Sequence, residues 1–417
     1  MNTETERLYE IFCTSKGVQT DSRKVTCGEM FFALKGDNFD GNRYAAAALD
    51  AGAVVAVVDD ASVAKDERYV IVNDALMALQ ALARHHRRRL SAKVLAITGT
   101  NGKTTTKELT SAVLASRYRV CYTKGNLNNH IGVPLTLLSI PADTEIAVVE
   151  MGASAQGEIA LLASIAEPDC GLVTNIGRAH LEGFGGVEGI RKGKGELYDF
   201  LAAHDGVAIY RADDSVLSDM VAEREGLRSV GYNSSLAEGV RSNLVGDYNR
   251  FNIAAAIAVG DYFGVPRECA EAAIAAYEPS NNRSQAVATG RNLLTVDCYN
   301  ANPSSMAASI ANHIAAESHD YHHKVLILGD MLELGEWSAE EHRKVLQMAV
   351  ASDVVESILL VGRCFAGAAG ECYDERVRSF AGVEQAALWL KEKPIEGAFV
   401  LVKGSRGIGL ERLLGEL

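Results

Sequence analysis

The chain has 417 residues, of which 48% are hydrophobic and 23% charged, and a formal net charge of -13. This composition excludes a disordered or fibrous protein, and the length predicts two or three domains. The acidic balance argues against a nucleic-acid-binding surface, and no apolar run approaches the roughly 18 residues that a membrane helix needs. We therefore expect no nucleic-acid partner and no integral membrane segment.

The eight cysteines bear on the compartment. They are scattered, with no CxxC pair and no His/Cys cluster of zinc spacing, so neither a disulfide framework nor a structural zinc site is predicted. The N-terminal MNTETERLYE is polar and acidic, unlike a signal peptide. The cytoplasm is the expected compartment, and a monomer is the expected state.

The first predicted unit, residues 1–91, is a small α/β domain. FFAL (31–34) is apolar, VVAVVD (54–59) is strand-like, and an alanine-rich helical stretch lies between them at 45–52. The one dense basic run, HHRRR (85–89), follows an apolar-periodic stretch. We interpret it as the solvated end of a helix.

The second predicted unit, residues 92–283, alternates short apolar strands with helices, which implies a parallel sheet covered on both faces. Its clearest elements are the strands VLAIT (94–98), IAVVEMG (146–152) and CGLVTNIG (170–177), and a long apolar helix from Phe251 to Gly264.

The third predicted unit, residues 284–417, follows the polar, turn-forming PSNNRSQ (279–285), which is a plausible domain boundary. This unit is again α/β. Its expected strands are at 293–299, 324–330, 357–362 and 398–404.

The stretch TGTNGKTTT, residues 98–106, joins a buried strand to a predicted helix, which is the context of a phosphate-binding loop. Only two residues separate Gly99 from the Gly102-Lys103 pair, where the usual pattern has four. Loop amides would point at phosphate oxygens, Lys103 would lie near the β/γ-phosphates, and the Thr104 hydroxyl would bind Mg²⁺. Glycine-rich turns also occur for packing, but the attached GKT favours nucleotide binding.

A metal site is predicted at the carboxyl edge of the same sheet. Glu150 ends the apolar run IAVVE and His180 follows CGLVTNIG, so both fall where strand ends and ligands meet. Either residue alone is more often a satisfied polar group, but together with a phosphate loop they favour a divalent metal. Lys192 and Lys194 precede a helix farther on, and the sequence alone leaves open whether both are exposed or one lies near the phosphates.

These motifs resemble those of the Mur ligases, ATP-dependent amide-bond-forming enzymes of peptidoglycan synthesis, over essentially the whole chain. The shortened phosphate loop and NIGRAHLEGFG (175–185) carry the family likeness. Four stretches point, within the family, to the addition of D-alanyl-D-alanine: GNLNNHIGVPLTLL (125–138), EMGASAQGEI (150–159), DCYNANPSSMAAS (297–309) and LGDMLELG (328–335).

The resemblance implies an α/β fold of three domains. A small N-terminal α/β domain (1–91) would bind the uridine nucleotide, because Asp21 to Tyr44 is similar to the family's uridine-nucleotide-binding segment. A central P-loop ATPase domain with a mainly parallel sheet (92–283) and a C-terminal Rossmann-like domain (284–417) would follow.

The resemblance also implies ATP as cofactor, with two Mg²⁺ ions. Lys194 aligns with a lysine that family members carry as a carbamate, which would turn a cation into an anionic metal ligand. The expected metal ligands are Thr104, Glu150, His180 and Lys194. The residues expected to act in catalysis are Lys103, Glu150, His180, Lys194 and Asp297. Those expected to bind ATP are Gly99, Thr100, Asn101, Gly102, Lys103, Thr104, Thr105, Asn249, Asn252 and Arg283.

Two small molecules are the implied partners, UDP-N-acetylmuramoyl-tripeptide and D-alanyl-D-alanine. The UDP portion would contact Ser22, Arg23, Asp40 and Gly41. Further substrate contacts are expected from Asn126, Asn128, Asn129, Tyr299, Asn300 and Asn302. Whether the third residue of the tripeptide is meso-diaminopimelate or L-lysine stays open.

The implied reaction passes the γ-phosphoryl group of ATP to the tripeptide carboxylate, and the dipeptide amine then attacks the acyl phosphate. Rival interpretations are the ligase that adds the third residue, a folylpolyglutamate-synthase-like enzyme, a nucleotide-dependent switch and a non-catalytic binding module. No DNPR signature of the third-residue ligase occurs, and the N-terminal DSR segment speaks against the folate-type enzyme. A switch would hydrolyse nucleotide without forming an amide.

Overall fold

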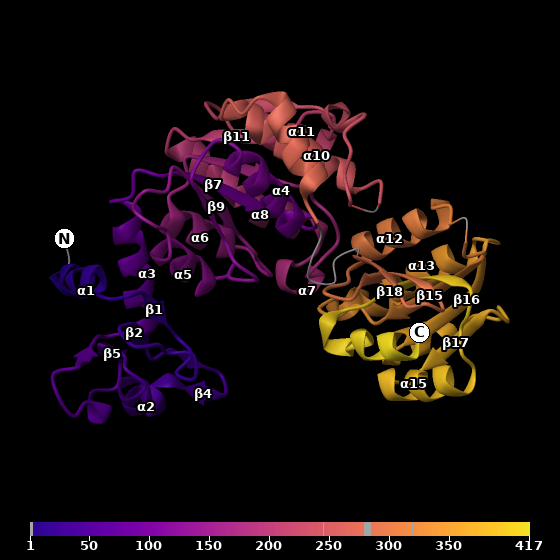
Figure 1. Ribbon diagram of the computed structural model, residues 1–417, viewed down its shortest axis with the longest axis horizontal. Helices are drawn as coiled ribbons and strands as arrows, with labels where there is room; N and C mark the ends of the chain where they lie inside the picture. Colours follow the sequence, from indigo (N-terminus) through magenta and orange to yellow (C-terminus); the bar gives the residue numbers. More distant parts are fainter. Residues whose placement is uncertain (1–2, 245, 279–284, 319) are drawn as a thin grey trace.

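The computed structural model of the chain describes residues 3–244, 246–278, 285–318 and 320–417. It contains three α/β units in chain order, and in Figure 1 the second unit bridges the first, at the left, and the third, at the right. The predicted α/β fold with parallel sheets is confirmed.

The first unit is built on a four-stranded parallel sheet with the order β1-β2-β5-β6. Its two inner strands are apolar and almost entirely buried, so they form its centre. The helices and strands of the unit are α1 (Thr3–Thr14), β1 (Val18–Gln19), β2 (Met30–Phe32), β3 (Lys35–Gly36), β4 (Phe39–Asp40), α2 (Ala45–Asp50), β5 (Val55–Val58), β6 (Tyr69–Ile71) and α3 (Ala75–Arg87).

The second unit has a six-stranded parallel sheet with the order β12-β11-β10-β7-β9-β8. Its strands are β7 (Lys93–Thr98), β8 (Val120–Tyr122), β9 (Ile146–Glu150), β10 (Cys170–Val173), β11 (Val207–Arg211) and β12 (Arg228–Tyr232). Its helices are α4 (Lys103–Ala115), α5 (Gly132–Leu138), α6 (Glu158–Ala166), α7 (Leu181–Phe184), α8 (Val187–Ala203), α9 (Ser215–Ala222), α10 (Asn249–Tyr262) and α11 (Arg267–Ala276).

The central strand β7 shows why this sheet is covered on both faces. Val94 and Ala96 point into the core shared with α5, α6 and α8, whereas Leu95 and Ile97 point into the core shared with α4, α10 and α11. This alternation is what an apolar strand with two buried faces requires. Strands β9 and β10 lie on opposite sides of β7, so the order in which strands are added to the sheet switches sides at β7. Open α/β sheets bind ligands at the carboxyl ends of the strands at such a switch point.

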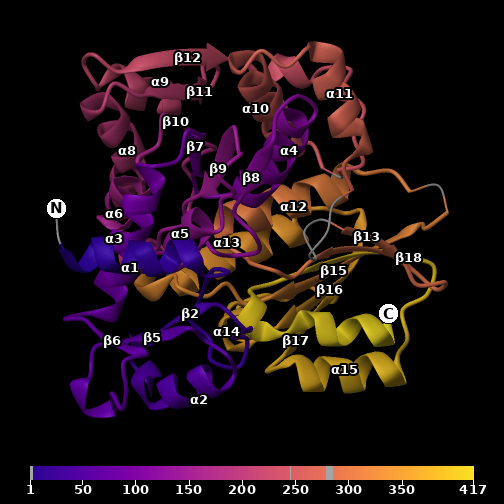
Figure 2. The same ribbon diagram turned by 60° about the vertical axis from the view of Figure 1, so that its left-hand side comes forward.

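Helix α3 joins the first unit to the second, and in Figure 2 it lies beside α5 and α6. Leu79 and Leu82 of α3 belong to one continuous hydrophobic cluster with Leu137 of α5 and Leu162 of α6. The first two units therefore share a core.

One residue of the basic run at the end of α3 contradicts the prediction that this run is solvated. The helix does end there, at Arg87, but the Arg87 side chain is only 11% exposed. Its guanidinium donates to the carbonyl oxygens of Ala166 (2.8 Å) and Glu167 (2.9 Å) and to the Asp169 carboxylate (2.9 Å). These carbonyls are the open C-terminal end of α6, which attracts a cation, so Arg87 is an interdomain contact and not a solvated residue.

The third unit has a six-stranded sheet with the order β13-β14-β18-β15-β16-β17, in which only β13 runs antiparallel to its neighbour. Its strands are β13 (Gln285–Ala288), β14 (Leu293–Asp297), β15 (His323–Gly329), β16 (Val355–Val361), β17 (Val377–Phe380) and β18 (Ala398–Lys403). Its α-helices are α12 (Pro303–Ala315), α13 (Ser338–Val350), α14 (Arg363–Ala369) and α15 (Val383–Glu392).

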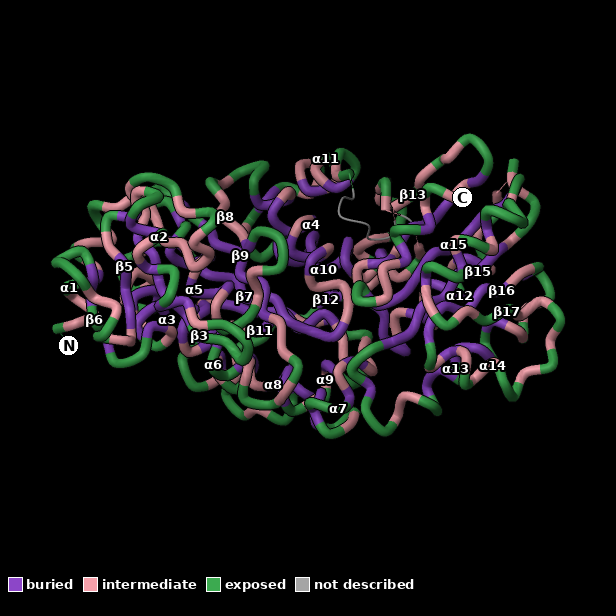
Figure 3. Tube along the Cα trace, turned by 90° about the horizontal axis from the view of Figure 1, so that it is seen from below, coloured by how far each residue is buried: buried purple, intermediate pink, exposed green. Residues whose placement is uncertain are grey.

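Buried backbone follows the central strands of the sheets, and exposed residues gather in the outer loops, as Figure 3 shows. The predicted boundary at 279–285 lies, except for its last residue, outside the described residues. The exact domain limits therefore stay a prediction.

Candidate active site

The loop after β7 has a backbone that only glycine can supply at two points. Gly99 and Gly102 have φ values of 134° and 80°, and a Cβ at either position would collide with a side chain, Thr174 or Asn252 respectively. Within the described part of the chain, no side chain caps the start of α4 at Lys103. The amides and the positive end of α4 therefore face the space in front of the loop, which suits an anion.

Lys103 is held against this loop. Its Nζ donates to the carbonyl oxygens of Gly99 (2.8 Å) and Thr100 (2.9 Å). The loop itself is fixed from β10, because the Thr174 hydroxyl donates to the Asn101 carbonyl (2.6 Å) and the Asn175 side chain accepts from the Asn101 amide (3.1 Å).

Glu150, at the end of β9, presents a carboxylate with two unlike oxygens. Oε1 accepts from the Thr104 hydroxyl (3.2 Å) and from Asn128 Nδ2 (2.8 Å). Oε2 is buried and has no hydrogen-bond partner among the described residues, and the nearest charge is Lys107 Nζ at 3.7 Å. Lys107 is itself 1% exposed and lies as close to Glu108. An orphaned carboxylate oxygen beside a threonine hydroxyl offers the hard oxygen ligands that Mg²⁺ prefers.

His180 lies at the start of α7 in the left-handed backbone region, with φ 52°. Its Nδ1 contacts the Glu333 carboxylate of the third unit. Burial lowers the pKa of His180, against the opposite effect of Glu333. A neutral imidazole has a lone pair to offer a metal.

Lys194 and Lys192 differ sharply in their surroundings. Lys194 is buried on α8, where its Nζ donates to the Ala153 carbonyl (3.1 Å) and lies 4.9 Å from the Phe184 ring centroid. Burial, aided by the charge of Lys103, lowers the pKa of Lys194 well below its usual range. Lys192 is exposed. Only Lys194 therefore combines proximity to the loop with a tendency to be neutral.

The third unit supplies the opposite wall. Asp297, at the end of β14, pairs with Lys403, at the end of β18, at 2.5 Å, and Lys403 is only 2% exposed. Asn302 caps α12 by accepting from the Ser305 amide (2.9 Å), while its Nδ2 donates to Asn101 Oδ1 of the phosphate loop (2.8 Å). The two units are thus in direct polar contact at the loop.

These groups border one cleft of about 770 Å³, within the usual range for a small-molecule site. The predicted residues that line it are Thr100, Asn101, Gly102, Lys103, Thr104, Thr105, Asn126, Asn128, Asn129, Glu150, His180, Asn249, Asn252, Asp297, Tyr299, Asn300 and Asn302. Gly99 and Lys194 lie directly behind this lining. Arg283 lies outside the described residues.

The residues expected to hold the UDP portion are not in this cleft but in the first unit. Asp40 accepts from the Asn42 amide (3.0 Å), and a Cβ on the adjoining Gly41 would lie 2.5 Å from the Leu34 carbonyl oxygen. The Arg23 side chain is 86% exposed and pairs with Asp21, whose pKa it lowers to about 2. Ser22 is partly exposed beside them.

Several residues in the cleft or in contact with its lining were missed by sequence reasoning. Lys107 follows Thr104 by three positions and so shares its helix face, a signal that was available. Arg211 lines the cleft with its guanidinium 4.1 Å from the centroid of the Phe251 ring, and the two residues come from different elements. Glu333 reaches His180 from another unit, and no local pattern indicates that contact.

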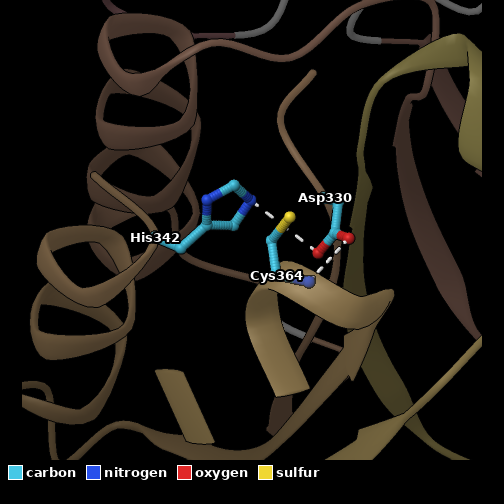
Figure 4. A group of neighbouring side chains, drawn as sticks. All are labelled: Asp330, His342 and Cys364. Atoms are coloured by element: carbon cyan, nitrogen blue, oxygen red, sulfur yellow. Dashed lines mark hydrogen bonds and ion pairs between the residues drawn. The ribbon is translucent and has the colours of Figure 1, made fainter. Parts of the chain in front are cut away.

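A second cluster of metal-binding residue types, Asp330, His342 and Cys364, lies in the third unit (Figure 4). His342 Nε2 accepts from the Met331 amide (3.0 Å), and its Nδ1 donates to the Ser338 carbonyl (2.7 Å). The Asp330 carboxylate accepts from the amides at the start of α14 (2.8 and 3.0 Å). Both ring nitrogens are already engaged, so this cluster holds the loop after β15 and leaves no imidazole lone pair for a metal.

No helix in the described ranges has the length and apolarity needed to cross a membrane.

Comparison with protein families matches three consecutive parts of the chain. Residues 14–87 match "Mur ligase family, catalytic domain", residues 97–238 match "Mur ligase middle domain", and residues 282–406 match "Mur ligase, glutamate ligase domain".

Individual relatives match over the full length. The UDP-N-acetylmuramoyl-tripeptide--D-alanyl-D-alanine ligase of Bacillus subtilis is 36% identical, covering 96% of this chain and 93% of its own. The crystal structure of MurF from Acinetobacter baumannii superposes with a TM-score of 0.85 at 28% identity, covering 99% of this chain and 98% of that one. The MurF ligase of Thermotoga maritima in complex with ADP has a TM-score of 0.82 at 26% identity, covering 100% and 98%.

Proposed function

The chain belongs to the Mur ligase family, and we propose that the cleft between its second and third units is where it joins D-alanyl-D-alanine to UDP-N-acetylmuramoyl-tripeptide. The enzyme is an ATP-dependent ligase, and its products are UDP-N-acetylmuramoyl-pentapeptide, ADP and phosphate. This placement rests on one observation. The shortened phosphate loop, Glu150 with its unpaired oxygen, and the Asp297–Lys403 ion pair all border the same cleft.

A carboxylate is a poor electrophile, so the reaction needs activation of the tripeptide. The terminal carboxylate oxygen attacks the γ-phosphorus of ATP, the bond to ADP breaks, and an acyl phosphate forms. The dipeptide amine then attacks the acyl carbon, loses a proton, and expels inorganic phosphate. In this scheme the α4 amides and Lys103 hold the phosphates and spread the charge of the transfer.

We propose that Thr104 and Glu150 hold one Mg²⁺ and that His180 serves a second. The orphaned Oε2 of Glu150 and the hydroxyl beside it supply the donor atoms that such an ion needs. When bound, Mg²⁺ neutralises charge on the phosphate oxygens. Lys107 Nζ lies 3.7 Å from Glu150 Oε2 and so places a positive charge beside the proposed ligand.

We propose that Lys194 is the carbamylated lysine. Carbamylation joins the amine nitrogen to the carbon of CO₂ with loss of a proton, so it needs a neutral amine. Burial lowers the pKa of Lys194 and so favours that form, whereas the Lys192 side chain is exposed to solvent. Mass spectrometry of protein trapped in ¹³C-bicarbonate places the label; label on Lys192 instead would reject the assignment.

The remaining substrate contacts follow from the walls of the cleft. Asn252 donates to Asn249 Oδ1 (2.8 Å) and accepts from Thr106 (3.1 Å), so the pair presents a fixed amide edge to the adenine side. Asp40 and Gly41 would hold the UDP end in the first unit, which allows a long substrate to span two units. The substrates are two nucleotides and a dipeptide, all water-soluble, and we propose that the enzyme works in the cytoplasm.

The test is an assay with ATP, Mg²⁺, D-alanyl-D-alanine and the UDP-muramoyl-tripeptide in both third-residue forms, following phosphate release and product mass together. The expected result is a pentapeptide product with one tripeptide preferred. Lys103→Ala should lower the rate by at least about a hundredfold, because a loop cation on the transferring group is lost. Phosphate release that is indifferent to the dipeptide, with no new mass, would contradict the proposal.

A further inference from the structure

The segment 177–184, which carries His180, belongs to the second unit by sequence but packs into the third. Leu181 and Phe184 lie in one hydrophobic cluster with Met306, Met331 and Leu334 of the third unit. Both residues are at most 2% exposed. Removing the third unit would therefore uncover the apolar side of this segment.

Polar contacts from the third unit fix the same segment. The Arg178 amide donates to Ser304 Oγ (2.8 Å) at the start of α12. The Arg178 guanidinium pairs with Glu341 of α13 at 2.7 Å, where the Glu341 side chain is 3% exposed. Lys344 also lies 3.3 Å from Glu341. With the contact between Glu333 and His180, three separate parts of the third unit hold the segment, namely α12, α13 and the loop after β15.

The Glu150 half of the proposed metal site is held differently. Glu150 is fixed by Thr123, Asn128 and Thr104, all of which belong to the second unit. No contact from the third unit to the Glu150 side chain is found within the described ranges. The two halves of the site are therefore supported by different parts of the molecule.

We infer that docking of the third unit places His180, and that Arg178 is a positioning residue that couples the two through Glu341 and Ser304. The inference rests on the proposed function, in which His180 serves a metal. His180 has a left-handed backbone, a conformation that a non-glycine residue keeps only when its surroundings impose it. Glu333 of the third unit contributes to those surroundings. Contacts within the second unit also hold the segment, since the Gly177 amide donates to Thr100 Oγ1 (2.9 Å) and the Phe184 carbonyl accepts from Gln156 (3.1 Å). Nucleotide can thus meet Thr104 and Glu150 first, and the His180 side of the site is completed only by docking.

The central variant is Arg178→Ala, assayed for pentapeptide formation. It should lower kcat roughly ten- to a hundredfold, as loss of a residue that orients a metal ligand does. The KM for ATP should change by less than about threefold, because the phosphate loop is untouched. Arg178→Lys keeps the charge and should recover much of kcat. Glu341→Gln should act like Arg178→Ala, and the double variant should be no worse than the worse single one.

A matched control is available at the other boundary of the second unit. Arg84 pairs with Glu167 at 2.9 Å, which is again an arginine–glutamate contact between two units, but it lies away from segment 177–184. Arg84→Ala should leave kcat within about twofold of the parent, as expected for an exposed pair.

Two measurements without turnover complete the test. Hydrogen exchange in residues 177–184 should accelerate in Arg178→Ala and not in Arg84→Ala. Binding of Mn²⁺ in the presence of ADP, counted by electron paramagnetic resonance, should fall from two ions to one in Arg178→Ala if the variant stays folded by circular dichroism. If the parent is active, the inference is overturned when Arg178→Ala is as fast as the parent, or when its hydrogen exchange and Mn²⁺ count equal those of the parent. An inactive parent would instead contradict the proposed function.

Discussion

Two buried basic side chains, Lys194 and His313, lie where their charged forms are poorly solvated. Lys194 is buried beside the phosphate loop, and His313 lies on α12 with its ring 4.3 Å from that of Phe399. Neither nitrogen of His313 has a hydrogen-bond partner among the described residues. Burial thus selects the neutral form of both, but only Lys194 lies where a neutral amine has chemistry to perform.

His313 predicts a pH dependence of the stability of the third unit. Burial lowers its pKa to about 4, whereas an unfolded chain has the ordinary value near 6.5. Between pH 4 and pH 6.5 His313 binds a proton in the unfolded state but not in the folded state. The contribution of neutral His313 to the unfolding free energy is therefore fully present above pH 6.5 and is lost as the pH falls toward 4. The difference corresponds to about 3 kcal/mol.

Urea unfolding followed by tryptophan fluorescence measures this effect, because both tryptophans, Trp337 and Trp389, are in the third unit. Between pH 7 and pH 4 the unfolding free energy should fall less in His313→Leu than in the parent. At pH 4 the variant should be at least as stable as the parent. The exposed His322 gives the control, His322→Gln, which should keep the parent's slope. Parallel curves for parent and His313→Leu would show that His313 does not carry the proton.

At the scale of elements, α12 is the part of the third unit that meets the phosphate loop. Asn302 caps it within a capping box, since Ser305 Oγ also accepts from the Asn302 amide (3.0 Å). The same Asn302 side chain pairs with Asn101. One residue therefore starts a helix and docks a domain, and its two roles can be separated.

Asn302→Ser and Asn302→Ala separate these roles. Serine is a good N-cap but is too short to reach Asn101, so Asn302→Ser should keep the stability of the third unit and lower the rate of ligation about tenfold. Asn302→Ala should lower the rate as much and also cost about 1 kcal/mol of stability, because the cap is lost. Tryptophan-detected unfolding and the ligation assay give the two readouts. Full activity in Asn302→Ser would mean that the amide pair contributes nothing to docking.

The elements also show how far the sequence alone reaches. Strands β7, β9, β15 and β18 are continuous apolar runs, so their position and the carboxyl edge that gathers Lys103 and Glu150 could be predicted. The pairing of Asn101 with Asn302 joins positions 201 apart, and no local pattern indicates it. The burial of Arg87 was missed for the same reason, since its partners end a helix 79 or more positions later. Sequence patterns specify elements and edges, whereas contacts between units depend on how the units pack.

At the scale of the whole molecule, the two interfaces of the second unit are of different kinds. Toward the first unit it shares a continuous hydrophobic cluster through α3, closed by Arg87. Toward the third unit the apolar contact runs through segment 177–184 and its neighbours, and the polar pair Asn101–Asn302 lies beside the cleft. A shared core makes two units unfold together, whereas an interface that contains a cleft lets a third unit move.

The shared core predicts that the first and second units form one cooperative unit. Hydrogen exchange in urea should show protection lost at the same denaturant concentration in β5 of the first unit and β9 of the second. The tryptophan signal of the third unit should follow a transition of its own. Arg87→Ala leaves the α6 carbonyls without their buried donor, so it should lower the opening free energy of both β5 and β9 by about 1–3 kcal/mol and leave the tryptophan transition in place.

Arg88 provides the control for this prediction, because it ends the same helix and pairs with Glu167 at 2.6 Å, but its side chain is 57% exposed. Arg88→Ala should cost less than about 1 kcal/mol, as exposed ion pairs usually do. If β5 and β9 lost protection at different urea concentrations, or if Arg87→Ala shifted only one of them, the first unit would be an independent domain held to the second by contact alone. Loss of protection in β5 and β9 at the same urea concentration would instead mean that the third unit alone is free to open and close on the nucleotide. The motion would then occur at the boundary that contains Arg178, His180 and Asn302.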